Sequence, residues 1–235
     1  MAEGQIIVTG ASKGIGSAIA AELGRRGHAI AAISRSGTTE TGYGVACDIT
    51  DEAALAAAGA TIAQRGPIVG LVNNAGAHVG GPALALTAAD FEASIRLNTT
   101  SVLMASREVQ PHLVAAGGGL IVNIGSFFEK LGVPDNLAYC ASKAAVGAIT
   151  RCLATEWAVQ NIRVMNVAPG YIETDLNKDY LGRDKVRAWL ARRIPVGRPG
   201  QVGEVARLVA ALYQEQIGFL TGETIFIDGA QGHNH

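Results

Sequence analysis

Three side chains with complementary acid–base chemistry, Ser126, Tyr139 and Lys143, fall within one short stretch of the sequence. If the chain is helical from Ala138 onward, Tyr139 and Lys143 are four residues apart and leave the same face of the helix. Ser126 follows an apolar run, residues 120–125, that is typical of a buried strand. A strand end and a helix face are therefore expected to bring a hydroxyl, a phenol and an ammonium group to one point.

These three groups suit proton transfer to or from an oxygen atom. Tyrosine, with a free pKa of about 10, is a poor base near neutral pH unless its anion is stabilised. A neighbouring ammonium group, here that of Lys143, provides such stabilisation and lowers the phenol pKa. The alternative for an isolated tyrosine, a half-buried side chain of a packed helix, does not account for the serine and the lysine beside it.

A glycine-rich loop opens the chain. Residues 5–9 read as a buried strand, and Gly10, Gly14 and Gly16 separate them from an alanine-rich helical stretch from Ser17 to about Arg26. Glycines allow a tight turn and a close approach of the backbone to phosphate, and the start of a helix attracts an anion. The spacing, Gly-x3-Gly-x-Gly, also occurs in plain turns, so the loop alone leaves nucleotide binding and an ordinary turn open.

The end of the second strand predicts the type of nucleotide. Residues 29–34 form an apolar run that ends at Ser34 and Arg35, with Lys13 as a second cation in the glycine loop. A carboxylate at this place would hold a ribose 2′-hydroxyl, whereas arginine suits a 2′-phosphate. We therefore expect NADP(H) rather than NAD(H). The alternative is that Arg35 is a solvated surface charge.

Strand-like and helix-like stretches alternate along the whole chain. Further strands are expected at 44–47, 68–73, 120–125, 163–168 and 224–227. Helices are expected from Thr50 or Asp51 to about 64, from 88, after a Thr87 cap, to about 116, from 138 to about 160, and from 201 to 213. The connection from 35 to 48 is too short for a helix as well as a strand. This order predicts an α/β fold, a parallel sheet covered on both faces, whose ligands bind at the carboxyl ends of the strands.

Several polar positions fall at or near those ends. Asp48 is either a turn residue or a carboxylate that accepts a hydrogen bond from an adenine amino group. Asn98, inside a long helix, is either exposed or marks an irregularity where side chain and backbone bind water. A charged segment at about 171–194 interrupts the alternation and is expected to cover the substrate.

Composition narrows the class of protein. The 235 residues are 49% hydrophobic, which is enough to form the core of one large domain, and we expect a single domain, 1–235. The formal net charge of −1 gives no electrostatic reason to expect binding to nucleic acid or to a membrane surface. Three widely spaced cysteines, Cys47, Cys140 and Cys152, fit reduced thiols, and the sequence shows neither a signal peptide nor a membrane span; we expect a cytoplasmic protein. His233 and His235 are the only hint of a metal site, and a polar chain end is the more ordinary explanation, so no metal is expected.

Taken in order, the motifs resemble the classical short-chain dehydrogenase/reductase family. The resemblance runs through Thr9-Gly-Ala-Ser-Lys-Gly-Ile-Gly16, Asp48, Asn73-Asn-Ala-Gly76, Asn98, Ser126, Tyr139-x-x-x-Lys143, and Pro169-Gly170 with Thr174. It implies a Rossmann-type doubly wound sheet of about seven strands, a nicotinamide cofactor, and a homotetramer or homodimer. The sequence departs from the family pattern in the short 35–48 connection and in Phe127-Phe128-Glu129, where small residues are expected after the serine.

The resemblance also implies roles for individual residues. Tyr139 would be the general acid/base, Lys143 would lower its pKa and hold the nicotinamide ribose, Ser126 would bind the substrate oxygen, and Asn98 would order a water that relays protons to Lys143. The cofactor would be bound by Tyr139 and Lys143 together with Gly10, Ser12, Lys13, Gly14, Ile15, Gly16, Ser34, Arg35, Asp48, Ile49, Asn74, Ala75, Gly76, Pro169, Gly170, Ile172 and Thr174.

The substrate is less determined by the sequence. An apolar pocket, suited to an aliphatic or aromatic carbonyl compound, is expected from Phe127, Phe128, Tyr171, Tyr180 and Leu181, although core packing explains some of them equally well; His78 either lines this cleft or lies on a surface loop. The expected activity is an NADP(H)-dependent carbonyl reductase or alcohol dehydrogenase. A 3-oxoacyl-[acyl-carrier-protein] reductase is the alternative, and a non-catalytic NADP-binding regulator is disfavoured by the complete catalytic set.

Overall fold

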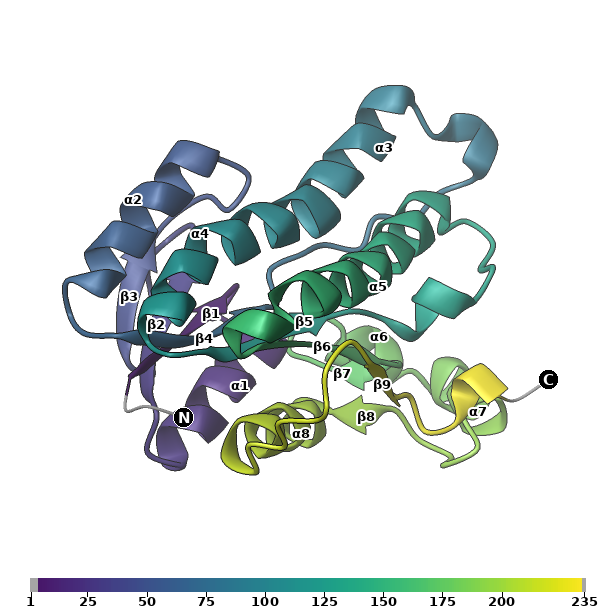
Figure 1. Ribbon diagram of the computed structural model, residues 1–235. Coiled ribbons are helices and arrows are strands. Elements are labelled where there is room, and N and C mark those ends of the chain that lie inside the picture. Colours follow the sequence, from purple (N-terminus) through teal and green to yellow (C-terminus); the bar gives the residue numbers. More distant parts are fainter. Residues whose placement is uncertain (1–3, 234–235) are drawn as a thin grey trace.

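The computed structural model of the protein, which describes residues 4–233, is built on a sheet of seven parallel strands (Figure 1). Their order, β3-β2-β1-β4-β5-β6-β9, reverses direction next to β1, as in a doubly wound fold. The strands are β1 (Gln5–Thr9), β2 (Ala29–Ser34), β3 (Tyr43–Ala46), β4 (Ile68–Asn73), β5 (Gly119–Ile124), β6 (Ile162–Pro169) and β9 (Thr224–Ile227). The predicted α/β architecture is confirmed.

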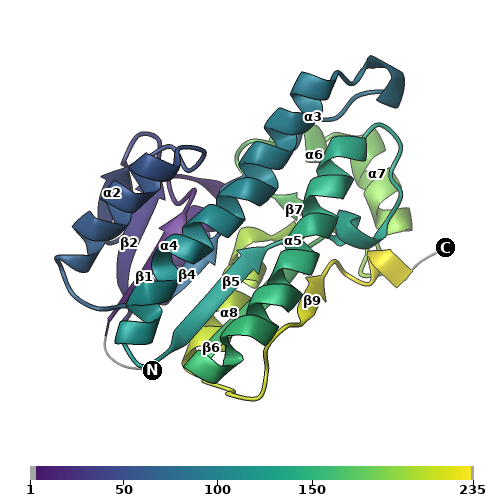
Figure 2. The same ribbon diagram turned by 45° about the horizontal axis from the view of Figure 1, so that its top comes forward.

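Helices cover both faces of the sheet. Helices α2 (Glu52–Ala63), α4 (Ser101–Ala115) and α5 (Leu137–Trp157) lie on one face, and α1 (Gly14–Arg25) and α8 (Val202–Gln214) lie on the other (Figures 1 and 2). The five inner strands each supply both apolar cores, because successive side chains point to opposite faces. In β1, Ile6 and Val8 pack toward α1 and α8, whereas Ile7 packs toward α2 and α4.

The long helical region after Thr87 is divided in two by an irregular turn. Helix α3 (Ala88–Ile95) passes into a π-helical turn, Arg96–Thr100, before α4 begins. Asn98 lies in this turn and is only 1% exposed. Of the two alternatives for Asn98, an exposed side chain or a helix irregularity, the structure shows the second.

The segment at 171–194 is more ordered than a single charged cover. It contains the short strand β7 (Ile172–Glu173) and two helices, α6 (Lys178–Leu181) and α7 (Asp184–Arg193). Strand β7 pairs with β8 (Gly200–Gln201) in a separate two-stranded sheet. A small apolar cluster of Leu181, Leu190 and Ile194 holds the segment together. The sequence analysis expected neither the second sheet nor the two helices.

Element boundaries follow local capping chemistry. Of the two candidate caps for α2, Asp51 is the one used: its carboxylate accepts hydrogen bonds from the amides of Ala53 and Ala54, at 2.9 and 3.0 Å. Thr87 caps α3 as expected, through the amide of Asp90. The 35–48 connection carries strand β3 and no helix, also as expected. The remaining short turns are η1 (Ala83–Ala85), η3 (Phe127–Lys130), η4 (Ala158–Gln160) and η5 (Gln231–His233).

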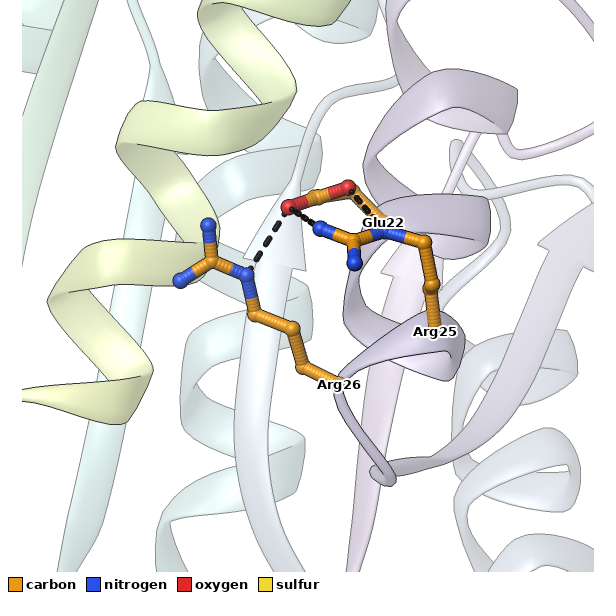
Figure 3. A network of polar contacts seen from close by, with 3 residues as sticks. All are labelled: Glu22, Arg25 and Arg26. Atoms are coloured by element: carbon orange, nitrogen blue, oxygen red, sulfur yellow. Dashed lines mark hydrogen bonds and ion pairs between the residues drawn. The ribbon is translucent and has the colours of Figure 1, made fainter.

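A compact ion-pair network closes the carboxyl-terminal end of α1 (Figure 3). The carboxylate of Glu22 accepts hydrogen bonds from the guanidinium groups of Arg25 and Arg26, each with a contact of 2.8 Å. These two hydrogen bonds lower the pKa of Glu22 to about 2. The network lies at the end of α1 opposite the glycine loop, so its role is local and structural.

No helix among residues 4–233 is long and apolar enough to cross a membrane. Within the same range, no group of three or more His, Cys, Asp or Glu side chains is arranged to hold a metal ion. His233 ends the last turn, η5, and His235, the other histidine considered at the chain end, lies outside the described residues.

Candidate active site and nucleotide cleft

The glycine loop is fixed by the end of β4 rather than by its own turn alone. The side-chain amide of Asn74 donates to the carbonyl oxygens of Thr9 and Gly10, at 3.0 and 3.3 Å. In return, the Thr9 hydroxyl accepts hydrogen bonds from the amides of Asn74 and Ala75, at 3.0 and 3.1 Å. Thr9, at the end of β1, and Asn74, just after β4, therefore hold the turns that follow these two strands together.

Close packing explains the glycines of this loop. Gly10 and Gly14 have φ of 67° and 61°, the left-handed region that favours glycine. Gly16 is needed for space: a Cβ atom there would lie 2.3 Å from the Gly10 carbonyl oxygen and 2.4 Å from Asn74 Nδ2. Gly16 does not line the cleft; its lack of a side chain allows the first turn of α1 to pack against the loop.

The start of α1 is open to an anion. The residue before the helix, Lys13, makes no capping hydrogen bond with its side chain, and no acidic residue occupies the first turn. The helix begins at Gly14, three residues earlier than expected, so the turn that carries free amide groups lies inside the glycine loop itself. Free amides and the positive end of the helix dipole suit a phosphate group at this point.

Arg35 and Asp48 lie just beyond the carboxyl ends of two paired strands, β2 and β3. The guanidinium of Arg35 is exposed and forms no ion pair with another residue between 4 and 233. One carboxylate oxygen of Asp48 accepts hydrogen bonds from the amide and the hydroxyl of Thr50, at 2.9 and 2.8 Å. These bonds, with the charge of Arg35, hold the pKa of Asp48 below its usual value. Asp48 is thus a turn residue; its contact with an adenine amino group stays a prediction.

Two adjoining hollows run along the carboxyl edge of the sheet. The first, of about 700 Å³, and the second, of about 610 Å³, share Ile15, Asn74, Gly76, Ala77, His78 and Thr174. The first is lined by residues expected to bind the cofactor: Gly10, Ser12, Lys13, Gly14, Ser34, Arg35, Asp48, Ile49 and Ala75. The second is lined by Ser126, Tyr139, Lys143, Pro169, Gly170 and Ile172. Of the predicted site residues, only Gly16 and Asn98 line neither hollow.

Lys143 is a buried cation. Its ammonium group donates a hydrogen bond of 2.7 Å to the carbonyl oxygen of Ile124, the last residue of β5. Burial lowers the pKa of Lys143 to about 8. The ammonium lies 5.8 Å from the centre of the Tyr139 ring, so the two side chains occupy the same side of α5, as the four-residue spacing predicts.

Tyr139 and Ser126 face each other across the second hollow. Burial raises the pKa of Tyr139, and a hydrogen bond with the side chain of Ser126 acts in the opposite direction. The sequence analysis expected Lys143 to lower the pKa of Tyr139, but in the structure Lys143 does not offset the effect of burial. Ser126 is fixed at the start of the η3 turn, where its hydroxyl accepts a hydrogen bond of 3.3 Å from the amide of Phe128.

The side chain of Asn98 is hydrogen-bonded to the loop after β4. Its amide oxygen accepts from the Ala77 amide and its nitrogen donates to the Ala77 carbonyl, both at 2.9 Å. The same nitrogen also reaches the Ser142 hydroxyl, at 3.3 Å. A Cβ atom at Gly76 would lie 2.8 Å from Asn98 Oδ1 and 3.8 Å from Lys143 Nζ. Asn98 and Lys143 therefore approach the same glycine, while the expected water relay between them stays a prediction.

The second hollow has an aromatic wall. The rings of Tyr139, Phe128, Phe127, Tyr171 and Trp189 form a chain of edge or tilted contacts, with centroid separations from 4.6 to 5.9 Å. Tyr180 and Leu181 also line the hollow, as expected. Core packing and pocket lining are not alternatives here: Phe127 and Phe128 are 3% and 7% exposed and line the hollow as well.

His78 takes part in this pocket despite its place on a loop. Its ring meets the Tyr139 ring edge-on at 4.9 Å, and its Nε2 is hydrogen-bonded to the side chain of Asn136, just before α5. Asn136 itself was not singled out by the sequence analysis. It precedes the helix that carries Tyr139 and Lys143 but belongs to none of the motifs, and only the fold brings it to the loop after β4.

Sequence reasoning also missed a buried polar chain behind the site. Asn73 donates to Asn123 at 2.9 Å, and Asn123 donates to Thr150 at 2.9 Å, which links β4, β5 and α5. The one available signal was an asparagine within each of two otherwise apolar strand runs. Buried amides of this kind must be paired, so such positions predict cross-strand partners.

Comparison with known proteins places this arrangement among oxidoreductases. A family profile described as Enoyl-(Acyl carrier protein) reductase matches residues 10–230. The 3-oxoacyl-[acyl-carrier-protein] reductase MabA of Mycobacterium tuberculosis is 33% identical over 232 residues, which cover 98% of this chain and 93% of that protein. Gluconate 5-dehydrogenase of Gluconobacter oxydans is 30% identical, with 95% of this chain and 92% of that protein covered.

A solved structure extends the similarity to the fold. The gluconate 5-dehydrogenase of Burkholderia cenocepacia, crystallised in complex with NADP and tartrate, superimposes with a TM-score of 0.91 at 31% identity. The match covers the whole of this chain and 97% of the other. This chain therefore shares both its sequence pattern and its architecture with the solved structure.

Proposed function

The chain belongs to the classical short-chain dehydrogenase/reductase family of oxidoreductases, and we propose that within it the protein is an NADP(H)-dependent carbonyl reductase. In the reverse direction it oxidises the corresponding secondary alcohol. The observation that carries the proposal is the meeting of Ser126, Tyr139 and Lys143 in one hollow, directly beside a hollow lined by cations and free helix amides. Two adjoining hollows of this kind suit a reaction between a bound nucleotide and the carbonyl group of a second molecule.

The residues of the first hollow fit a dinucleotide phosphate. The open start of α1 suits the pyrophosphate, and Arg35 with Lys13 supplies positive charge where a ribose 2′-phosphate would lie. Bound NADPH supplies the hydride. The chain's own residues then have to hold the nicotinamide end, for which Pro169, Gly170, Ile172 and Thr174 are placed at the border of the second hollow.

The proton chemistry falls to Tyr139. In the reductive direction, the carbonyl oxygen takes the phenol proton, and Ser126 donates a second hydrogen bond to the same oxygen. Burial raises the pKa of Tyr139, so the phenol is protonated in the free protein but is a weaker acid unless its anion is stabilised. The ammonium of Lys143 stabilises the negative charge that develops on the phenol oxygen, and Asn98 holds the neighbouring loop in position.

The aromatic wall favours a carbonyl compound with an apolar or aromatic body. Phe127 and Phe128 come directly after Ser126, so the apolar surface begins beside the reacting oxygen. Burying such a substrate against the rings of this wall that line the hollow, Tyr139, Phe128, Phe127 and Tyr171, stabilises it by about 25 cal/mol per Å² of apolar surface removed from water.

Replacing Tyr139 by phenylalanine tests the proposal most directly. The change removes one oxygen atom from the site and leaves the first hollow intact. We expect NADPH oxidation with a panel of ketones to fall by about 10²–10⁴-fold, the usual contribution of a general acid, while NADPH still binds. Fluorescence titration of NADPH provides the binding control, and a variant that still turns over at the wild-type rate would contradict the assignment.

The preference for NADP(H) depends on Arg35. In Arg35→Ala we expect the KM for NADPH to rise by about 10–100-fold, because a charge-assisted contact worth roughly 1.5–3 kcal/mol is lost. The KM for NADH should change little. Steady-state kinetics with both cofactors in wild type and variant make the comparison, and equal effects on the two would point to a general loss of folding or binding instead.

A 3-oxoacyl-[acyl-carrier-protein] reductase is the second candidate, favoured by the similarity to MabA over nearly the whole chain. Acyl carrier proteins are acidic, so this role needs a basic docking surface. Two of the cations near the cleft are paired with carboxylates, which reduces the positive charge available for docking: Lys178 pairs with Asp175 at 3.4 Å, and Arg198 pairs with Glu204 at 2.9 Å. Saturable activity with an acyl-carrier substrate, far above that with a free ketone, would favour this candidate.

A non-catalytic NADP-binding regulator is disfavoured, because such a protein has no need of a serine, a tyrosine and a lysine in one hollow. The same ketone panel distinguishes the two. We also propose that the protein acts in the cytoplasm as a homotetramer or homodimer, which sedimentation velocity would resolve.

A further inference from the structure

Lys143 carries its charge in an unusually apolar place. The side chain is 5% exposed, and its ammonium makes one hydrogen bond, to the Ile124 carbonyl. Within residues 4–233 it has no ion-pair partner within 4.0 Å. A buried ammonium without a counter-charge tends to lose its proton. In the proposed reaction the ammonium must be charged to stabilise the phenolate of Tyr139, so a nearby carboxylate that keeps it protonated would support turnover.

Glu129 is the carboxylate that enters this region from the loop after Ser126. Its Oε2 accepts a hydrogen bond of 2.7 Å from the side chain of Asn166 in β6, and it also bonds the side chain of Thr224 in β9. Asn166 is fully buried and is held to Thr224 by a second hydrogen bond of 3.1 Å. The carboxylate is therefore fixed in a built polar cluster and does not extend freely into solvent.

The other oxygen of Glu129 rests on helix α5 at a glycine. A Cβ atom at Gly147 would lie 3.2 Å from Glu129 Oε1 and 3.5 Å from an amino nitrogen of Arg151. Glycine in the interior of a helix is destabilising relative to alanine, and here its effect is to leave room for the carboxylate. Lys143, Gly147 and Arg151 follow one another at intervals of four residues, so they share a face of α5. The carboxylate thus lies between two cations, each one helical turn away.

The two charges act on each other. Burial raises the pKa of Glu129, whereas the charges of Arg151 and Lys143 and the hydrogen bonds from Asn166 and Thr224 lower it. Burial also lowers the pKa of Lys143 to about 8, and the charge of Glu129 raises it. The groups that face Glu129 are therefore Lys143 and Arg151 from α5, Asn166 from β6 and Thr224 from β9. Among them, Lys143 is the buried cation.

We propose that Glu129 is a positioning residue of the active site, whose carboxylate is the counter-charge that keeps the buried ammonium of Lys143 protonated. The inference rests on the proposed function, because it assigns Glu129 a part in the proton chemistry of Tyr139 and Lys143. It also gives a reason for the departure of Phe127-Phe128-Glu129 from the small residues expected after Ser126. The two phenylalanines line the substrate hollow, whereas the Glu129 carboxylate lies against Gly147 of α5, four residues after Lys143.

The pH dependence of turnover tests the proposal. Glu129→Gln keeps the size of the side chain and a hydrogen-bonding oxygen for Asn166 but removes the charge. Loss of the charge lowers the Lys143 pKa further, so we expect the alkaline limb of kcat/KM for ketone reduction to move to lower pH by at least half a unit. Glu129→Asp, which keeps the charge, should recover part of the shift. Glu156→Gln, the same change at an exposed position of α5, is the matched control.

Unfolding of the cofactor-free protein gives a second measurement that needs no turnover. We expect Glu129→Gln to be less stable than wild type at pH 7, where the attraction between carboxylate and ammonium is present. The difference should shrink as the pH rises through about 8, because the folded wild-type protein then also loses the Lys143 proton. A role limited to the hydrogen bond with Asn166 predicts a difference that does not vary over this range.

A pH-rate profile that coincides with wild type, or a stability difference that stays constant from pH 7 to 10, would overturn the proposal. Failure of the proposed function is distinguishable from this result. In that case the wild-type protein would reduce no ketone with NADPH, while the unfolding measurements would still decide whether Glu129 supports the charge of Lys143.

Discussion

At the scale of single residues, Tyr139 and Lys143 show opposite responses to the same burial. Both leave α5 on one face, yet Lys143 donates to the end of β5 while Tyr139 faces Ser126. Burial raises the pKa of the phenol and lowers that of the ammonium, so it favours the neutral form of each. A neutral phenol is the acid that carbonyl reduction needs, whereas a neutral lysine cannot stabilise the phenolate. The site therefore depends on interactions that keep Lys143 charged.

The charge of Lys143 should cost stability. A shift of the pKa from 10.5 to about 8 corresponds to roughly 3 kcal/mol at 1.36 kcal/mol per unit. We expect Lys143→Met to abolish turnover and to raise the free energy of unfolding at pH 7 by about 1–3 kcal/mol, because an apolar side chain of similar length removes a buried charge while Arg151 remains as a cation beside Glu129. The gain should be full below pH 8 and vanish above pH 10.5, where lysine is neutral in both folded and unfolded chains.

Urea unfolding of wild type and Lys143→Met at pH 7 and pH 10.5 checks this expectation. Equal or lower stability of the variant at pH 7 would mean that the ammonium is better solvated or better paired than its surroundings suggest. Lys178→Met, a change at an exposed lysine, controls for the loss of a positive charge as such.

At the scale of elements, the site is built where the ends of β1 and β4 are tied to one another. Thr9 and Asn74 exchange hydrogen bonds across the two strand ends, and Gly16 lets the first turn of α1 lie directly against the Gly10 carbonyl. The helix start is therefore set by contacts with β4, which lies more than fifty residues further along the chain. This explains why α1 begins three residues before the position that the alanine-rich stretch predicts.

A methyl group at Gly16 should separate these elements. The Cβ would lie 2.3 Å from a backbone oxygen, a distance that requires the loop or the helix to move. For Gly16→Ala we expect a loss of about 2 kcal/mol or more in the free energy of unfolding and an NADPH affinity at least tenfold weaker. Gly132→Ala is the matched control, because a Cβ there meets nothing within 4 Å. Denaturant titrations and NADPH binding, measured for both variants, make the comparison; unchanged NADPH affinity in Gly16→Ala would contradict the role given to the loop.

The elements that the sequence predicts well are those whose pattern is local. The buried strands of a parallel sheet are continuous apolar runs, so β1, β2, β4, β5 and β6 are recognisable from sequence alone. The π-turn is different: Asn98 hints at it, but what stabilises the turn is the hydrogen bonding of Asn98 to Ala77, 21 residues away. Strand β7 is set by its pairing with β8, in which Ile172 lies opposite Gly200. Neither contact leaves a periodic signal.

The site follows the same rule. The motif residues of the glycine loop and of the Tyr139–Lys143 helix have fixed local spacing, and most of them line the two hollows as expected. Asn136, Asn123 and Thr150 take part through contacts between distant elements and carry no motif. The commitment of the Asn98 side chain to Ala77 likewise depends on the fold. Local spacing predicts which residues meet the ligands, whereas the residues that hold them are found only in three dimensions.

At the scale of the whole molecule, function is concentrated at one edge of the sheet. The carboxyl ends of β1, β2, β4, β5 and β6 all supply residues to the two hollows, whereas the ion-pair network of Glu22 lies at the other end of α1 (Figure 3). The segment from β7 to β8 borders this edge, beside the second hollow (Figure 1). Its helices α6 and α7 pack on a small apolar cluster, Leu181, Leu190 and Ile194, whereas Ile172 of β7 belongs to the main core.

That arrangement suits a cover whose position depends on what lies beneath it. Thr174, Asn177 and Tyr180 from this segment line the second hollow, so a bound cofactor and substrate would add contacts that the segment otherwise lacks. Segments with few apolar contacts to the rest of the protein open locally at low free-energy cost, and ligands that bind only the closed form suppress the opening.

Limited proteolysis should report this closure. The segment carries six exposed trypsin sites: Lys178, Arg183, Lys185, Arg187, Arg192 and Arg193. We expect saturating NADPH to slow cleavage at these sites by at least threefold, and NADPH with a ketone substrate to slow it further, because opening then requires loss of the ligand contacts. Tyr139→Phe, which should bind NADPH without turning over, is expected to show the same protection and separates binding from catalysis. Cleavage rates that do not respond to NADPH at saturation would show that the segment is no cover, and the substrate would then reach Tyr139 through a site that stays open throughout the reaction.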